Sequence, residues 1–312
     1  MTDPLAPGSP VAGAPDPVPG TGASGPATLR TIARAGLVVT LAFAVSRVLG
    51  YARYVVIGTT FDAGRELDAF FAAFRIPDFL FQLVAAGALS SALIPVVAGL
   101  VAQREEERAW RVVSTVVTLM LAALAVLSLL VLVFAEVLVP PITPGFEPDQ
   151  RATTVELTRL MLLSPLFLAL GAVATSVLNV RGRFGAAAVA PIVYNLGIIL
   201  AAVFLAPILG VAGLAVGVVV GAAGHVLVQL PALRASGARF GLLADLRDPA
   251  ARRALALMVP RAIGLGSPQI VFLVMTSLAS LLEPGAISAF TFAFAVLQIP
   301  IGVIGVPLGV VL

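Results

Sequence analysis

The chain has 312 residues, of which 60% are hydrophobic and only 11% are charged, and its mean hydropathy is +1.08. A soluble protein carries about 25% charged residues, so most of this chain is expected to lie in lipid. Cysteine is absent and His225 is the only histidine, which excludes disulfides, a cysteine nucleophile, a histidine-based zinc site and a histidine-dependent catalytic triad.

The first 29 residues are rich in proline, glycine, alanine and serine and show no apolar period. Such a segment cannot bury enough apolar surface to fold, so residues 1–29 are predicted to be a disordered cytoplasmic tail. No cleavable signal peptide fits, because the first apolar run is long, contains Arg47 and Arg53, and lacks a convincing cleavage site.

Eight apolar segments follow, most of them about 20 residues or longer, with short polar loops between them. This pattern predicts an all-α polytopic membrane protein with about eight transmembrane helices. Pro77 and Gly87 interrupt the second segment. The eighth segment is still apolar at Leu312, so we expect the chain to be truncated at its C-terminus. The predicted segments are 32–59, 67–101, 112–139, 158–178, 185–208, 210–233, 254–282 and one that begins at residue 286.

Arginine is concentrated in alternate loops of this pattern. The other loops and their edges hold little more than Arg65, Arg151 and Arg159, which stand beside acidic residues. By the positive-inside rule, the arginine-rich loops and the N-terminus are expected to face the cytoplasm. The arginines on that side are Arg30, Arg34, Arg104, Arg108, Arg111, Arg181, Arg183, Arg234, Arg239, Arg247, Arg252 and Arg253.

A weak internal similarity relates the second segment to the eighth. Residues 68–74 read DAFFAAF and residues 288–294 read SAFTFAF, and an Ile-Pro pair follows each with a shift of three residues. Duplicated halves with a site between them are typical of transporters. After the tail we therefore predict a complete six-helix lobe over 30–234, a cytoplasmic linker over 235–253 and the start of an incomplete second lobe over 254–312.

Four arginines lie inside or close to apolar segments: Arg47, Arg53, Arg75 and Arg261. A charged side chain in a spanning helix costs roughly 3 kcal/mol on insertion scales and usually persists where it faces a water-filled cavity or a partner. The four therefore point to a site for an anionic ligand within the membrane. The alternative for Arg53 is snorkelling to the interface, and the alternative for Arg261 is a place at the cytoplasmic boundary.

Asp68 and Arg75 are seven residues apart and so lie on nearly the same helical face. They could form an ion pair, or Asp68 could be an N-terminal helix charge that the helix dipole favours. Arg75 precedes Pro77, which removes a helical hydrogen bond. The freed carbonyl is tolerated mainly beside a polar cavity, although the kink could also serve packing alone.

The remaining motifs indicate packing more than chemistry. Gly213, Gly217 and Gly221 form a small-residue ladder that predicts close contact with a neighbouring helix. His225 and Gln229 are interpreted as hydrogen-bonded packing residues. No phosphate-binding loop, dinucleotide fingerprint or metal-ligand set occurs, so no metal site is expected. The pI of about 10.1 is not interpreted as nucleic-acid binding.

Three stretches carry a resemblance to a known family: SRVLGYAR at 46–53, DAFFAAFRIP at 68–77 and GALSSALIPV at 87–96. The chain resembles the MurJ (MviN) family of lipid II flippases, part of the multidrug/oligosaccharidyl-lipid/polysaccharide exporter superfamily. The resemblance covers essentially everything after the tail. It implies a fold of two six-helix lobes around a central cavity, with two further helices.

The resemblance also implies an activity. Lipid II, the undecaprenyl-pyrophosphate-linked murein precursor, would be flipped from the inner to the outer leaflet of the bacterial cytoplasmic membrane by alternating access. The protein would be a multi-pass transporter, not an enzyme. It would use no cofactor, and transport would be coupled to membrane potential or to a monovalent ion. The implied partners are the precursor, membrane lipids and other cell-wall synthesis proteins.

Site residues follow from the same resemblance by position. Arg47 and Arg53 match two basic family positions in the first span, Asp68 matches an acid in the second span, and Arg75 matches a basic cavity position. Arg261 could add a further charge. These five residues are the predicted substrate-binding set.

The chain departs from the family at several charged positions. The family often carries arginine where Phe81 or Gln82 stands and near Ala295, and an acid where Tyr54 and Ala86 stand. These differences keep three alternatives open: an exporter of another polyprenyl-linked glycan or a drug, a non-transporting membrane scaffold, and an inactive fragment.

Overall fold

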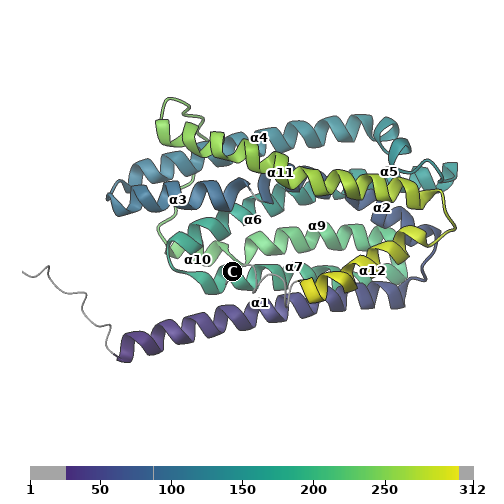
Figure 1. Cartoon of the computed structure of the whole chain (residues 1–312), viewed down its shortest axis with the longest axis horizontal. Coiled ribbons are helices and arrows are strands. Elements are labelled where there is room, and N and C mark those ends of the chain that lie inside the picture. Colours follow the sequence, from purple (N-terminus) through teal and green to yellow (C-terminus); the bar gives the residue numbers. More distant parts are fainter. Residues whose placement is uncertain (1–25, 87, 302–312) are drawn as a thin grey trace, which may run out of the picture.

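The computed structural model of the chain describes residues 26–86 and 88–301, and every regular element within these ranges is a helix (Figure 1). The elements in chain order are α1 (Pro26–Thr60), α2 (Arg65–Phe81), the π-helical turn η1 (Gln82–Ala86), α3 (Ala88–Ala102), α4 (Glu106–Leu138), the short 3-10 turn η2 (Pro140–Ile142), α5 (Pro148–Met161), α6 (Leu163–Val180), α7 (Phe184–Phe204), α8 (Ala206–Leu209), α9 (Val211–Leu227), α10 (Leu230–Ala235), α11 (Pro249–Ser280) and α12 (Ala286–Pro300). The predicted all-α fold is confirmed.

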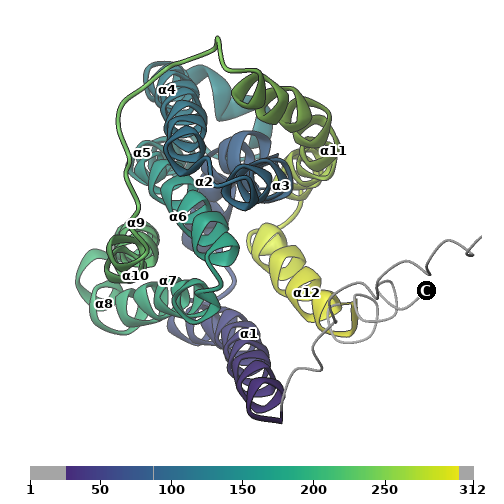
Figure 2. The same ribbon diagram turned by 90° about the vertical axis from the view of Figure 1, so that its left-hand side faces the viewer.

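Most of the long helices run roughly side by side, so the loops between them gather at two ends of the molecule (Figures 1 and 2). We call one the Asp68 end; it holds the loops 61–64, 139–147 and 281–285. We call the other the linker end; it holds the loops 103–105 and 181–183 and the linker 236–248, which joins α10 to α11.

The predicted apolar segments all appear as helices, but not all as single long ones. Six are long and apolar enough to cross a membrane: Thr40–Thr60, Glu106–Leu138, Pro148–Val180, Phe184–Phe204, Val211–Ala235 and Pro249–Ser280. The second predicted span is divided between α2 and α3, and the eighth is described only as far as residue 301. Helices suit a membrane because they satisfy every backbone polar group within the segment.

The second span is interrupted from Gln82 on, between the two predicted interruptions at Pro77 and Gly87, of which Gly87 lies outside the described residues. Pro77 lies inside α2, which continues to Phe81 before the π-helical turn begins at Gln82. Proline lacks the N–H that would bond to the carbonyl of Ala73. The hydroxyl of Thr158 lies 3.4 Å from that carbonyl oxygen. The same hydroxyl donates to the carbonyl oxygen of Thr154 at 2.8 Å, so its single proton is shared at best weakly with the freed carbonyl.

The glycine ladder of α9 packs against α7, as predicted. A methyl group added to Gly217 would collide with the side chain of Ala201, and one added to Gly221 would lie 2.7 Å from the carbonyl oxygen of Tyr194. Only glycine lets the two backbones approach this closely. The close contact fixes α7 beside α9.

The linker between α10 and α11 runs along α4. Backbone N–H groups of the linker donate to side-chain hydroxyls of α4, from Gly241 to Ser114 (3.2 Å), from Leu243 to Thr118 (3.1 Å) and from Asp245 to Thr115 (3.2 Å). Hydroxyls on one face of α4 thus accept hydrogen bonds from backbone N–H groups of an extended segment that belongs to no helix or sheet. The linker is therefore held along α4.

Candidate functional site

A cavity of about 1250 Å³ lies between helices from both parts of the chain. Residues of α1, α2, α6, α7 and α9 line it on one side, and residues of α11 and α12 complete it. Most of the lining is aromatic or aliphatic. Its charged members, among the described side chains, are Arg47, Arg53, Arg75 and Asp78. Three of the predicted substrate-binding residues therefore meet in one cavity.

Arg75 connects the first lobe to α11 and α12. Its Nε donates to the hydroxyl of Thr276 at 3.0 Å, and its Nη2 donates to the hydroxyl of Thr291 at 3.2 Å. The guanidinium also lies 5.1 Å from the ring centre of Phe272. These partners are all uncharged, so they satisfy hydrogen bonds of the guanidinium without neutralising its charge.

Arg53 lies among aromatic rings. Its guanidinium is 4.7 Å from the ring centre of Tyr54 and 6.0 Å from that of Tyr194. A cation over an aromatic face is stabilised by the ring quadrupole while remaining charged. Arg47, two turns earlier in α1, is exposed and lines the same cavity. Neither arginine belongs to an ion pair among the described residues.

Asp68 does not line this cavity. Its buried carboxylate accepts hydrogen bonds from the backbone N–H of Gly285 (2.6 Å) and from the N–H (2.8 Å) and hydroxyl (2.6 Å) of Ser288. These donors belong to the first turn of α12, so Asp68 satisfies the free N–H groups of another helix. The ion pair with Arg75, one alternative from the sequence, is not formed in this structure.

The side chain of Arg261 lies outside the described part of the structure, although its backbone belongs to α11. Its predicted role therefore stays a prediction. The same holds for the position of the Ala86 side chain.

Asp78 is the cavity residue that the sequence analysis missed. It follows Arg75 by three residues, which places both side chains on the same face of α2. The sequence signal was present, because Asp78 is a charged residue within an apolar segment, as the arginines are. Its carboxylate has a side-chain hydrogen bond with Gln82, the first residue of the π-helical turn.

Two family positions that lack their usual arginine also lie in the cavity wall. The resemblance implies arginine at Phe81 or Gln82 and near Ala295; Phe81 and Ala295 line the cavity, and Gln82 does not. Gln298, one turn from Ala295, lines it too. Among its described residues, the cavity therefore holds fewer arginines than the resemblance implies.

A polar cluster joins α6 to α9 beside the cavity. The amide of the fully buried Gln229 donates to the carbonyl oxygens of Gly171 (3.2 Å) and His225 (2.9 Å) and accepts from the hydroxyl of Thr175 at 3.0 Å. The packing interpretation of Gln229 is thus confirmed. His225 packs against Gly171 and lines the cavity.

The Asp68 end is closed by contacts between segments far apart in the chain. Gly145 touches the backbone of Ser280 so closely that any side chain there would collide, and its N–H donates to the hydroxyl of Ser280 at 3.2 Å. The hydroxyl of Ser277 donates to the carbonyl oxygen of Pro141 at 3.1 Å. The loop before α5 is thereby attached to the end of α11.

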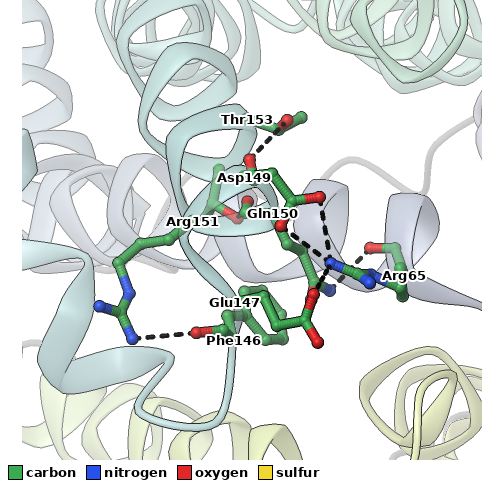
Figure 3. Close-up of polar contacts among 8 residues, drawn as sticks. Arg65, Phe146, Glu147, Asp149, Gln150, Arg151 and Thr153 are labelled. Carbon is green, nitrogen blue, oxygen red and sulfur yellow. Dashed lines mark hydrogen bonds and ion pairs between the residues drawn. The ribbon is translucent and has the colours of Figure 1, made fainter.

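Charged residues at the surface hold the same end together (Figure 3). Arg65, at the start of α2, lies between Glu147 (2.8 Å) and Asp149 (2.9 Å) of the loop and first turn of α5. The amide of Gln150 donates to the backbone carbonyl of Arg65 at 2.9 Å. These exposed pairs are worth little individually, but they add to the closure of the Asp68 end.

Long apolar helices around a cavity define a polytopic helical membrane protein. A solved structure described as lipid II flippase MurJ in an inward closed conformation has the same fold, with a TM-score of 0.71 over 86% of this chain and 56% of that chain at 24% identity. A MATE protein in a bent conformation is similar with a TM-score of 0.60, over 88% of this chain and 61% of that chain at 16% identity.

The chain belongs to the MurJ family, because the family model described as lipid II flippase MurJ matches residues 57–312. A lipid II flippase MurJ from Burkholderia cenocepacia is 37% identical over 276 residues, covering 86% of this chain and 54% of the relative. A probable lipid II flippase MurJ from Vibrio cholerae is 29% identical, covering 91% of this chain and 56% of the relative. The chain thus spans about half the length of these relatives.

Proposed function

We propose that this chain carries the first lobe, and the start of the second, of a flippase for a lipid-linked peptidoglycan precursor in the bacterial cytoplasmic membrane. The family membership supports the cargo class, since the relatives are named as lipid II flippases. The arginine-rich loops support a cytoplasmic N-terminus and linker end. The Asp68 end would then face outward.

The observation that carries this proposal is the set of three arginines in one cavity between the two parts of the chain. Arg75 keeps its full charge beside two threonine hydroxyls, and Arg53 keeps its charge beside two tyrosine rings. A diphosphate offers several anionic oxygens, and guanidinium groups bind such oxygens by charge-assisted hydrogen bonds. Arg47, Arg53 and Arg75 would hold the diphosphate, and Arg261 would join them from α11.

Alternating access would proceed by separation of α11 and α12 from the first lobe at the Asp68 end. The contacts of Asp68 with α12, and of Gly145 and Pro141 with the end of α11, are what would have to break. We therefore propose that Asp68 stabilises the closed state through its contacts with α12 and does not touch the diphosphate. Coupling to membrane potential or to a monovalent ion belongs to the same proposal.

A second cargo class is favoured by one observation. Phe81 and Ala295 place apolar groups in the cavity where the family often has arginine. An exporter of another polyprenyl-linked glycan, or of an amphipathic drug, would suit such a wall. Competition between lipid II and a panel of polyprenyl-linked glycans for binding to the purified protein separates the two cargo classes.

The test is complementation of a flippase-depleted strain with the gene of this protein carrying Arg47→Ala or Arg75→Ala. We expect each substitution to abolish growth while the protein still reaches the membrane, because the diphosphate loses a charged partner. Arg159→Ala is the matched control, since Arg159 is not among the residues that line the cavity and pairs with exposed Glu136. Normal growth with both cavity substitutions would overturn the charge proposal.

A non-transporting scaffold predicts a different pattern. In that case Arg47→Ala would disturb protein partners in pull-down experiments and leave precursor flipping intact. A direct flipping assay in vesicles, run beside the pull-down, therefore separates transport from scaffolding.

A further inference from the structure

Asp78 places a carboxylate inside the cavity that the proposed function fills with an anion. It is the only carboxylate among the described residues that line the cavity, and it is half-buried in the wall formed by α2. Its neighbour along the helix face, Arg75, turns its guanidinium to Thr276 and Thr291. No ion pair within 4 Å joins Asp78 to an arginine in the described part of the chain.

The groups around Asp78 come from several helices. Its carboxylate has a hydrogen bond with Gln82 and interacts electrostatically with Arg75 of α2 and with Arg53 of α1. The carboxylate also interacts electrostatically with the phenol of Tyr194 in α7. The described lining residues of α6, α11 and α12 are uncharged. The other titratable groups of the cavity wall are Arg47, Tyr51, Tyr54 and His225.

This arrangement makes the charge on Asp78 depend on whether an anion is present. Burial in the cavity wall disfavours the charged form of Asp78, and in the empty cavity the positive charges of Arg75 and then Arg53 oppose that effect and favour the carboxylate. A bound diphosphate neutralises the positive charge of those arginines. It also brings its own negative charge into the cavity that Asp78 lines. A carboxylate beside a bound anion is disfavoured, and in a cavity of low dielectric constant the repulsion is strong.

We propose that Asp78 takes up a proton when a diphosphate binds to the arginines of the cavity and loses it when the diphosphate leaves. The proton comes from water and forms an O–H bond on the carboxylate, so no other reactant is needed. Protonated Asp78 keeps its place beside Gln82, whose amide offers both a donor and an acceptor. Asp78 thus serves as the counter-anion of the empty cavity. This inference rests on the proposed function, because it requires the cavity to bind a diphosphate.

The experiment is calorimetric titration of the purified protein with a water-soluble diphosphate diester, which keeps its charge constant between about pH 5 and pH 8. Titrations in two buffers with different heats of ionisation give the number of protons taken up per ligand bound. We expect uptake by the wild type, with affinity rising as the pH falls by up to about tenfold per pH unit. For Asp78→Asn we expect no proton uptake and an affinity that no longer depends on pH.

The matched control is Asp62→Asn, an exposed loop carboxylate outside the cavity, which is expected to behave as the wild type does. If the wild type binds the diester without proton uptake, or if uptake persists in Asp78→Asn, the inference is wrong and the proposed function stands. If the wild type does not bind the diester, both the inference about Asp78 and the proposed function are wrong. Should Asp78→Asn fail to fold, Asp78→Ser replaces it, and the wild-type titration still decides whether protons are taken up.

Discussion

Charged residues in the membrane part of this chain fall into two kinds according to their partners. Asp68 is fully satisfied by three donors from the start of α12, so its charge is used within the fold. Arg53 and Arg75 make hydrogen bonds and ring contacts only with neutral groups, and Asp78 is the one carboxylate among the described residues of their cavity, so the arginines there outnumber their counter-charge. Burying a charge without an opposite partner is costly, and it is therefore most readily explained by a ligand that supplies the missing charge.

At the residue scale, Asp68→Ala is expected to destabilise the protein without weakening diphosphate binding. The substitution leaves the buried N–H groups of Gly285 and Ser288 without an acceptor, at a cost of about 1–3 kcal/mol for each such group. Asp68→Asn retains one acceptor oxygen and should cost less. Thermal unfolding in detergent measures the stability, and titration with a diphosphate diester measures the binding.

Asp62→Ala, at an exposed position of the same end, controls for nonspecific loss of charge. If Asp68→Ala keeps its thermal stability but binds the diphosphate more weakly, this prediction is wrong. Asp68 would then belong to the substrate-binding residues, as the family resemblance implied.

Elements of this fold were predictable where their cause is local in the sequence. The apolar runs gave the helices, and the spacing of Gly217 and Gly221 gave the close approach of α9 to α7. Pro77 alone did not place the break in the second span, which begins at Gln82 and ends before α3 starts at Ala88, on either side of the other predicted interruption, Gly87. The carbonyl that the proline frees lies 3.4 Å from the hydroxyl of Thr158, a residue 85 positions away, and such a tertiary environment cannot be seen in the local sequence.

The candidate site shows the same limit. The arginines could be predicted from the cost of charge in an apolar segment, and the same argument applied to Asp78 would have included it. The partner of Asp68 could not be predicted, because Gly285 lies 217 residues further along the chain. No sequence pattern near Asp68 indicates which helix start its carboxylate will satisfy. Long-range pairing of this kind depends on the packed arrangement of the lobes.

At the element scale, Asp248 joins the start of α11 to α4. Its side chain accepts from the N–H of Ala250 at 2.7 Å, and from Nε of Arg108 at 2.8 Å. The hydrogen bond from Arg108 lowers the pKa of the Asp248 carboxyl, against the opposing effect of burial. Because this pKa is lower in the folded protein than in the unfolded chain, the contact stabilises the fold above the unfolded value of about 3.9. That stabilisation is lost as the pH falls through the lower folded value.

The wild type is therefore expected to lose thermal stability more steeply between about pH 5 and pH 3 than Asp248→Asn does. The difference should not exceed about 1 kcal/mol, because the side chain of Arg108 is 34% exposed and solvent screens the pair. Asp149→Asn, whose side chain is 76% exposed in its pair with Arg65, is the comparison variant and should show a smaller effect. Parallel pH curves for the wild type and Asp248→Asn would contradict this account.

At the scale of the whole molecule, the two ends are held by contacts of different kinds. At the linker end the first lobe holds the connecting segment and the start of α11 through hydroxyls of α4 and through Arg108. At the Asp68 end it holds the end of α11 and the start of α12 through a few hydrogen bonds and one close glycine contact. A rocking motion about the linker end would open the Asp68 end with little change elsewhere, as hinge motions of transporter lobes require.

Cross-linking at the Asp68 end tests this motion. The absence of cysteine gives a clean background, and Pro141 and Ser277 are surface positions joined by a 3.1 Å hydrogen bond. With Pro141→Cys and Ser277→Cys together, a short thiol cross-linker that cannot cross membranes should join the two positions in intact cells. This cross-link should stop growth in the complementation assay, because the closed end can no longer open.

Single-cysteine variants treated in the same way should grow normally and so control for modification alone. Efficient cross-linking with growth unimpaired would show that the Asp68 end does not separate during transport, and cross-linking only in broken cells would reverse the orientation derived from the arginine loops.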